Sequence, residues 1–175
     1  MNSKQKASHT GSVDARPRSL EMTVLVTPNM ANFGGKMHGG DVLKILDQVA
    51  YTCATRYCGQ YAVTLSVDRV LFKHPIYIGE LLRFLARVNY TGRTSMEVGI
   101  KVIAENIKKE SVRHTNTCYF TMVALDEDGK AVPVPPLSLR SDTDRQRFAA
   151  AQARRTARLH FKHPPPQGVE STHGA

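Results

Sequence analysis

The sequence has few cysteines and no long apolar stretch. Its three cysteines, Cys53, Cys58 and Cys118, form no Cys-x-x-Cys pair and have no histidine at a spacing that suits zinc. We therefore expect no disulfide framework and no metal site, and we interpret the cysteines as small core or boundary residues. Because no apolar run is long enough to cross a bilayer or to serve as a signal peptide, we expect no membrane partner and a cytoplasmic location.

The sequence also lacks the motifs of common hydrolases and nucleotide-binding proteins. No serine lies in a Gly-x-Ser-x-Gly elbow, and no His-Glu-x-x-His pair is present. The glycine-rich stretch lacks the Gly-Lys-Ser/Thr ending of a phosphate-binding loop, and neither its spacing nor its context fits a dinucleotide site. Serine hydrolase, zinc hydrolase and phosphate-loop chemistry are therefore set aside.

Acidic residues are in the minority, but the excess of positive charge lies mostly toward the ends of the chain. The net charge is +9, of which +3 falls on residues 1–20, +4 on residues 140–175 and only +2 on residues 21–139. A positive groove for nucleic acid would have to be built mostly from the two ends. We therefore expect no nucleic-acid partner.

Composition divides the chain into four segments. Residues 1–19 are polar and basic, and we expect a disordered arm there. A single domain follows over residues 20–138, since the chain is long enough to bury a core without disulfide or metal staples. Residues 139–162 are expected to form a basic C-terminal helix, and residues 163–175, which contain three consecutive prolines, a disordered tail.

Apolar residues recur at helical spacing from Gly40 to Tyr57 and fall on one side of a helical wheel. Asp47 departs from this division, because it lies at the edge of the apolar side. A carboxylate in such a position can act as a general base. The alternative is an ordinary solvated or hydrogen-bonded aspartate on the flank of a helix.

Alternating apolar and polar residues predict strands in the part of the chain that follows. The first strand runs from about Val63 to Phe72, with a β-bulge expected near Asp68 and Arg69. Further alternating runs cover residues 82–90, 96–104 and about 112–125. One long helix followed by strands that meet through short turns favours an antiparallel sheet, so we predict an α+β fold.

A later helix is expected from about Asp142 to Leu159, with Ser141 as its N-cap. The first turn is acidic, and arginines follow toward its end. These charges suit the helix dipole, which gives the arginines a structural explanation independent of any ligand.

The segment from Asn29 to Gly40 contains four glycines and directly precedes the first predicted helix. Glycines at the start of a helix let a ligand approach the backbone and leave N–H groups at the positive end of the dipole, where an oxyanion is stabilised. A flexible start of a helix without any ligand explains the same residues. His38, within this segment, could transfer a proton or simply hydrogen-bond a backbone group.

Several short motifs gain weight from their order along the chain. Ala31-Asn32 and His38-Gly39-Gly40 are followed by the helix that contains Asp47. Further segments are Val67–Phe72 with Pro75 and Gly79, Tyr90–Val98, and Thr115-Asn116. In order and spacing these motifs resemble the acyl-coenzyme A (acyl-CoA) thioesterases with a hot-dog fold, and the resemblance covers about residues 20–138.

This resemblance implies an α+β hot-dog fold, in which an antiparallel sheet wraps a long central helix, and hydrolysis of fatty acyl-CoA to a free fatty acid and CoA. Asn32 and Asp47 match the catalytic pair of the family and would meet across a dimer interface. Asp47 would activate water or attack directly, and Asn32 would orient the water or the carbonyl. The N–H of Gly40, helped by Gly39, would receive the oxyanion, and His38 completes the candidate catalytic residues.

The resemblance also implies binding residues and partners. Arg93, Thr94 and Ser95 would contact CoA at the start of a strand, while Arg154 and Arg155 are available for its phosphates. The implied assembly is a homodimer, with dimers further assembled into a trimer of dimers. Because CoA is part of the substrate and of the product, no cofactor and no metal are expected.

Two other functions are considered. A non-catalytic acyl-CoA sensor that regulates transcription would need a DNA-binding appendage, and the first 19 residues are too short and too polar to form one. A hot-dog dehydratase or hydratase would need an acid–base histidine paired with a carboxylate in the motif of that group, which the sequence does not contain.

Overall fold

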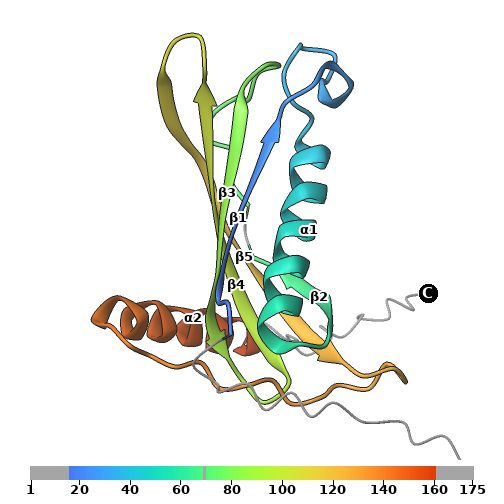
Figure 1. Ribbon diagram of the computed structural model, residues 1–175, viewed down its shortest axis with the longest axis vertical. Helices are drawn as coiled ribbons and strands as arrows, with labels where there is room; N and C mark the ends of the chain where they lie inside the picture. Colours follow the sequence, from blue (N-terminus) through green and yellow to red (C-terminus); the bar gives the residue numbers. More distant parts are fainter. Residues whose placement is uncertain (1–15, 69, 161–175) are drawn as a thin grey trace, which may run out of the picture. The chain divides into compact units, whose positions relative to one another are not determined.

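The computed structural model describes residues 16–68 and 70–160. In chain order these residues form β1 (Ser19–Leu25), a 3-10 helix (Pro28–Met30), α1 (Gly39–Cys58), β2 (Tyr61–Val67), β3 (Leu81–Thr91), β4 (Ser95–Asn106), β5 (Ser111–Leu125) and α2 (Asp142–His160) (Figure 1). The chain divides into two compact units, of which the first ends at Ser138 and the second begins at Leu139. The first unit contains α1 and the strands, and the second contains α2.

The strands of the first unit form one antiparallel sheet in the order β1-β3-β4-β5-β2. β1 and β2 are therefore its two edges. Figure 1 shows α1 lying along one face of this sheet, and the helix contacts every strand. The α+β arrangement predicted from the sequence is confirmed.

Capping residues define the two ends of α1. The N-cap residue His38 accepts a hydrogen bond from the backbone N–H of Gly40 through Nδ1, at 2.9 Å. The C-cap residue Gly59 has a φ of 70°, a left-handed conformation that favours glycine, and it donates its N–H to the carbonyl oxygen of Thr55 at 2.8 Å. The helix predicted from Gly40 to Tyr57 is confirmed and is one residue longer at each end.

The core lies between α1 and the inner face of the sheet. The fully buried residues of α1 recur at helical spacing and include Val42, Leu46, Val49, Ala50, Cys53 and Ala54. They share one core with alternate residues of the central strands, among them Leu82, Phe84, Val98, Ile100, Phe120 and Met122. Each large apolar side chain that is buried in this way stabilises the fold by roughly 1.5–3 kcal/mol.

All three cysteines are free and buried, which confirms their interpretation as small core residues. Burial raises the pKa of Cys53 and of Cys118 to about 12. Both thiols therefore stay protonated and unreactive at neutral pH.

β2 is shorter than the predicted strand. It ends at Val67, and residues 70–72 lie in no strand, so the predicted continuation to Phe72 is wrong. Leu71 and Phe72 are 45% and 51% exposed in the single chain. Their apolar character therefore does not come from burial within this sheet, which is why alternation alone misplaced the end of the strand.

The β-bulge of β2 also differs from its predicted position near Asp68. The register with β5 shifts between Thr64 and Ser66, so Leu65 is the extra residue. A bulge is set by the pairing with the neighbouring strand, and the alternation within one strand does not contain that information.

The runs predicted at residues 82–90, 96–104 and 112–125 are confirmed as β3, β4 and β5. β1 was not predicted, although its partly buried residues Leu20, Met22 and Val24 alternate with exposed ones. It begins at Ser19, the last residue of the segment assigned to the arm. Residues 1–15 of that segment lie outside the described residues.

In the second unit, α2 spans Asp142–His160, against the expected Asp142 to Leu159. Ser141 accepts a hydrogen bond from the backbone N–H of Asp144 through Oγ at 3.1 Å, which is the predicted N-cap contact. Residues 161–175, which include the predicted tail, lie outside the described residues.

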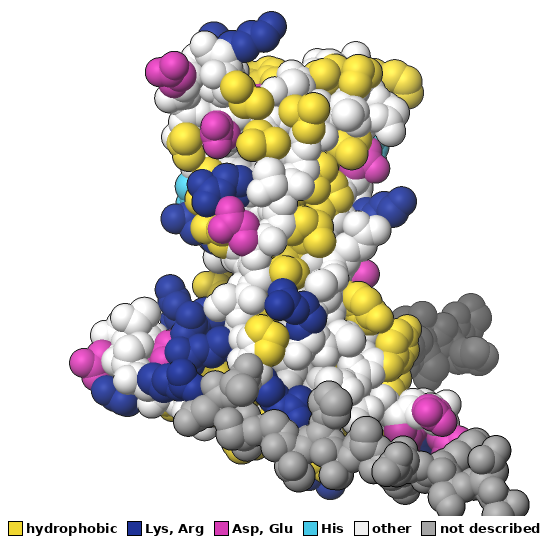
Figure 2. Space-filling model, viewed as in Figure 1, with side chains coloured by type: hydrophobic (Ala, Val, Ile, Leu, Met, Phe, Trp, Pro, Cys, Tyr) yellow, Lys and Arg dark blue, Asp and Glu magenta, His cyan; other side chains and the backbone are white. Residues whose placement is uncertain are grey.

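Several large apolar side chains of the first unit are exposed in the single chain. They lie on α1, on β2 and in the segment after β2, and include Tyr51, Tyr61, Leu65, Leu71 and Phe72. Figure 2 shows one face of the molecule, on which hydrophobic side chains gather in patches between single charged residues. Contiguous apolar surface of this kind is typical of a site that contacts another molecule.

Candidate active site

Asn32 organises the glycine-rich loop before α1. Its side-chain Oδ1 accepts hydrogen bonds from the backbone N–H of Gly34 at 2.9 Å and of Lys36 at 3.2 Å. Its own backbone N–H donates to the carbonyl oxygen of Lys36 at 2.7 Å. Gly35 completes the turn with a φ of 69°. The Asn32 side chain is therefore held in one orientation at the surface by the loop that follows it.

His38 and Gly40 are engaged with each other at the N-terminus of α1. The Gly40 N–H, which the sequence assigned to the oxyanion, donates to Nδ1 of His38 at 2.9 Å. An oxyanion at this N–H would have to take the place of the His38 ring. Of the two roles considered for His38, the structure shows the hydrogen bond to a backbone group, and the partner is the N–H assigned to the oxyanion.

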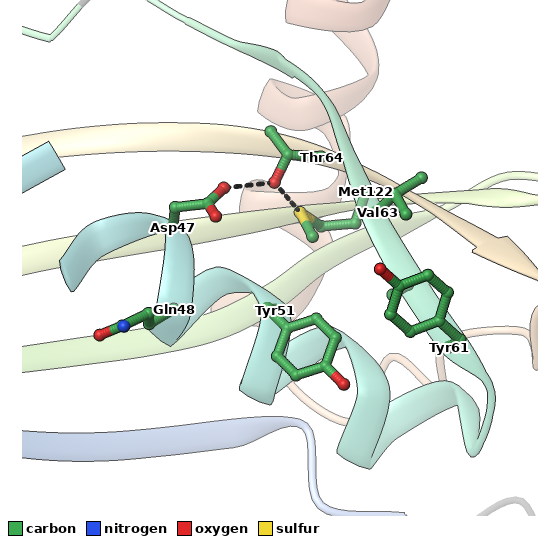
Figure 3. A pocket seen from close by; sticks show the side chains of 8 residues that line it. Asp47, Gln48, Tyr51, Tyr61, Val63, Thr64 and Met122 are labelled. Carbon is green, nitrogen blue, oxygen red and sulfur yellow. Dashed lines mark hydrogen bonds between the residues drawn. The ribbon is translucent and has the colours of Figure 1, made fainter. Parts of the chain in front are cut away.

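Asp47 projects from α1 toward β2, where it meets a residue that sequence reasoning did not select. The hydroxyl of Thr64 donates a hydrogen bond to Oδ1 of Asp47, at 2.6 Å. The same Thr64 Oγ1 lies 3.5 Å from the sulfur of Met122 on β5. Figure 3 shows the carboxylate and the hydroxyl pointing toward each other, one from the helix and one from the strand.

The Asp47–Thr64 pair lines an open pocket of about 230 Å³. Its lining combines Asp47, Gln48, Tyr51, Tyr61, Ala62, Val63, Thr64 and Met122. The rings of Tyr51 and Tyr61 pack edge to face with centroids 6.0 Å apart, and Figure 3 shows both beyond the Asp47–Thr64 pair. The pocket thus places one carboxylate and one hydroxyl beside aromatic and apolar surface.

Sequence reasoning did not select Thr64, because the alternation along β2 suggested that the apolar residues, not the polar ones, face the core. Val63, Leu65 and Val67 are the apolar residues of this alternation, yet Leu65 is 65% and Val67 is 43% exposed. Ala62, 1% exposed, and Thr64 are the residues on the side of α1. The sequence did contain one indication of Thr64. Asp47 interrupts the apolar side of the helix, so a polar residue was to be expected opposite its carboxylate.

One chain does not bring Asn32 and Asp47 into the same pocket. Asn32 is not among the residues that line the Asp47 pocket. Asp47 lies eight residues beyond Gly39, the first residue of α1, which corresponds to roughly 12 Å along the helix axis. That Asn32 and Asp47 of two chains meet across a dimer interface, as the resemblance implies, stays a prediction.

The residues predicted to bind CoA fall in two places. Arg93 and Thr94 lie in the turn between β3 and β4, and Ser95 is the first residue of β4. The backbone there is held by the bonds Gly92 N–H to Ser95 O (2.8 Å) and Ala124 N–H to Thr94 O (3.0 Å). Arg93 is exposed. Arg154 and Arg155 lie on α2, in the second compact unit.

Two further features bear on the class of site. Across residues 16–68 and 70–160, no group of three His, Cys, Asp or Glu side chains is arranged to hold a metal ion. None of the helices described is both long and apolar enough to cross a membrane.

The five-stranded antiparallel sheet on a long central helix defines the hot-dog fold. The family model described as the thioesterase superfamily matches residues 34–111. Protein VdlD of Helicobacter pylori is 51% identical over 147 residues, which cover 83% of this chain and 84% of that protein. An apo-hexameric acyl-CoA thioesterase is 34% identical, with a TM-score of 0.78 over 81% of this chain and 91% of that chain. The chain therefore belongs to the acyl-CoA thioesterase family with the hot-dog fold.

A solved relative also bears on the site residues. The acyl-CoA hydrolase of Staphylococcus aureus, in complex with butyryl-CoA, CoA and CoA disulfide, is 30% identical, with a TM-score of 0.73 over 81% of this chain and 88% of that chain. Alanine variants of that hydrolase were solved at an asparagine, an aspartate and a threonine that are 15 and 17 residues apart in this order. Asn32, Asp47 and Thr64 have the same spacing in this chain.

Proposed function

We propose that this chain hydrolyses fatty acyl-CoA thioesters to a free fatty acid and CoA, with Asp47, Thr64 and Asn32 as its catalytic residues. The observation that carries the proposal is the hydrogen bond from Thr64 to Asp47 inside an open, partly apolar pocket. The matching spacing of the three residues varied in the Staphylococcus aureus hydrolase supports the same assignment. The thioester hydrolase activity follows from family membership, and the residue roles are the finer part of the proposal.

In this mechanism Asp47 accepts a proton from a water molecule, whose oxygen attacks the thioester carbonyl carbon. The C–O bond to water forms, negative charge develops on the carbonyl oxygen, and the C–S bond then breaks. The sulfur leaves as the thiolate of CoA and takes up a proton. Thr64 donates to Oδ1 of Asp47 and so fixes the carboxylate, and in this proposal Oδ2 accepts the proton of the water. A thiolate is a good leaving group, so the site needs positioning and charge stabilisation more than a strong acid.

The oxyanion is assigned to the start of α1, where backbone N–H groups point along the positive end of the helix dipole. Because the Gly40 N–H is bonded to Nδ1 of His38, we propose that the substrate oxygen displaces the His38 ring. Gly39, which precedes Gly40, leaves space for the ligand beside the backbone. A Cβ built at Gly39 would meet ring carbons of Phe72, the nearest at 3.7 Å. Loss of one such donor typically costs about 3 kcal/mol of transition-state stabilisation.

We propose that Asn32 of one protomer acts beside Asp47 of its partner. The distance along α1 between the glycine-rich loop and Asp47 supports a site completed by a second chain. β2 is an edge strand that carries exposed apolar side chains, which supports pairing of protomers there. The solved hexameric thioesterase supports further assembly, and we propose a trimer of dimers.

For CoA we propose contacts to Arg93, Thr94 and Ser95 in the β3–β4 turn and to Arg154 and Arg155 on α2. Guanidinium groups bind phosphate oxygens with two parallel hydrogen bonds, and hydroxyl groups add shorter-range contacts. In this proposal CoA arrives with the acyl group and leaves with the thiol, so the reaction uses no separate cofactor and no metal.

Release of the free thiol from a panel of acyl-CoA substrates of increasing chain length tests the proposal. We expect turnover at neutral pH without added metal, and a loss of at least about a hundredfold in kcat for Asp47→Ala, because the general base is removed. We expect smaller losses for Asn32→Ala and Thr64→Val. Thr52→Val removes a hydroxyl from α1 that donates to the Gln48 carbonyl of the same helix, and it should leave kcat unchanged.

Two outcomes would contradict the proposal. If no acyl-CoA of any chain length releases thiol, although binding is detectable by calorimetry, the protein is a sensor rather than a hydrolase. If Asp47→Ala keeps full activity, the pocket is not the site of water activation.

A further inference from the structure

An ion pair with a buried carboxylate and a partly exposed guanidinium lies at the base of β3, outside the pocket. Glu80, which precedes β3, is 2% exposed, and its carboxylate accepts two hydrogen bonds from Arg113 on β5, Nη1 to Oε1 at 2.7 Å and Nη2 to Oε2 at 2.5 Å. Burial raises the pKa of Glu80, but the hydrogen bonds from Arg113 and from the backbone of Tyr77 outweigh it and hold this pKa below its ordinary value. Such an ion pair contributes little net stability, because the cost of removing its charges from water opposes their attraction. Its role is therefore better judged from the residues that it holds in place.

The pair fixes the segment of residues 75–77. The backbone N–H of Tyr77 donates to Oε2 of Glu80 at 2.9 Å. Arg113 donates a further hydrogen bond to the carbonyl oxygen of Pro75 at 2.8 Å, and its guanidinium lies 5.7 Å from the centre of the Tyr77 ring. Glu80 and Arg113 thus form hydrogen bonds to both ends of this segment, at Pro75 and at Tyr77.

Residues 75–77 pair with the loop that contains Asn32. Tyr77 forms an antiparallel bridge with Lys36, and the carbonyl oxygen of Ile76 accepts the N–H of Met37 at 2.8 Å. Lys36 in turn donates its N–H to Oδ1 of Asn32 at 3.2 Å and accepts the Asn32 N–H at 2.7 Å. Hydrogen bonds, together with the backbone of residues 75–77 and of residues 36–37, therefore connect the ion pair to the Asn32 side chain.

We infer that Glu80 and Arg113 are positioning residues, which orient the side-chain amide of Asn32 through residues 75–77 and Lys36. The inference rests on the proposed function, because it assigns to Asn32 a role at the thioester. Neither residue of the pair lines the Asp47 pocket, so both act through Asn32 and not on the substrate.

The test is a double-mutant cycle on kcat and KM. Glu80→Gln and the milder Arg113→Lys, which keeps the charge but not the paired donors, are each made in the wild-type chain and in an Asn32→Ala chain. Because a displacement of about 1 Å at a reacting group can cost up to about a hundredfold, we expect kcat to fall about tenfold in the wild-type chain, with KM little changed. In the Asn32→Ala chain we expect no further fall, since the group being positioned is gone.

Glu21→Gln is the matched control. Glu21 on β1 accepts a hydrogen bond from Nε of Arg83 on β3 at 2.9 Å, so it is also half of an Arg–Glu pair. That pair is exposed and touches no part of the loop. We expect its loss to leave kcat unchanged in both chains.

A second measurement does not depend on activity. Amide hydrogen exchange at Lys36 and Met37 should become faster in Glu80→Gln and stay unchanged in Glu21→Gln. Exchange unchanged in Glu80→Gln, or equal losses of kcat in the presence and absence of Asn32, would overturn the inference. Absence of thioesterase activity in the wild-type protein would instead overturn the proposed function, and faster exchange would still support the structural link.

Discussion

The smallest units of the site are two hydrogen bonds, each between a pair of residues. Thr64 supplies a hydroxyl to Asp47 at 2.6 Å, and His38 supplies a ring nitrogen to Gly40 at 2.9 Å. The first contact orients the carboxylate that we propose as the general base, and the second caps the N-terminus of α1.

For His38 we predict that its main role is to cap α1. Asparagine is also a good N-cap residue, so His38→Asn should keep the free energy of unfolding and most of kcat, whereas His38→Ala should lose about 1 kcal/mol of stability. Denaturant unfolding and thiol release measure the two effects separately. A large loss of kcat in His38→Asn with unchanged stability would show instead that the imidazole transfers a proton.

Residue identities that belong to short motifs could be predicted from the sequence, and those that depend on folding could not. Asn32 and Asp47 follow from the motifs before and within α1. Thr64 lies 17 residues from Asp47, and only the packing of β2 on α1 shows that the two meet. The engagement of Gly40 by His38 likewise depends on a side-chain rotamer that no residue pattern contains.

At the scale of elements, one ion pair joins the ends of two strands. The Glu80–Arg113 pair connects the start of β3 to the start of β5.

The long periodic elements, α1 and β3 to β5, were predictable because many residues repeat the same pattern. β1 and the end of β2 were not, because short edge strands bury too few residues to mark their limits.

The same pair predicts a pH dependence of stability. The pKa of Glu80 is lower in the folded chain than its ordinary value of 4.5. Its contribution is therefore complete above about pH 4.5 and is lost as the pH falls through the folded pKa, because protonation then favours the unfolded chain. Urea unfolding between pH 7 and pH 3 should show a shallower loss of stability below that value in Glu80→Gln. Parallel curves for the two proteins would contradict this.

At the scale of the whole molecule, the exposed apolar residues of β2 lie on a free sheet edge, and a site shared by two chains needs such an edge to be covered. Leu65 is 65% exposed. A charge placed there would be buried without a partner if protomers pair through β2.

We predict that Leu65→Arg lowers the oligomer mass in light scattering and reduces kcat together with it, because Asn32 and Asp47 would no longer meet. Ile107→Arg is the control: Ile107 is 54% exposed in the turn between β4 and β5, at the end of β5 opposite to the one that pairs with β2. An unchanged mass for Leu65→Arg would place the interface elsewhere.

The left-handed Gly59 also limits how this protein can be altered. Only Gly59 and Gln60 separate α1 from β2, and a Cβ at Gly59 would lie 3.1 Å from Arg16 in addition to the strain of its φ. Inserting or deleting one amino acid in this two-residue connection would shift β2 by one position and present valine or leucine to the carboxylate in place of threonine. The length of this connection, as much as the identity of residue 64, thus decides whether a hydroxyl faces Asp47. Engineered variants with a replaced connection must therefore keep its length of two residues.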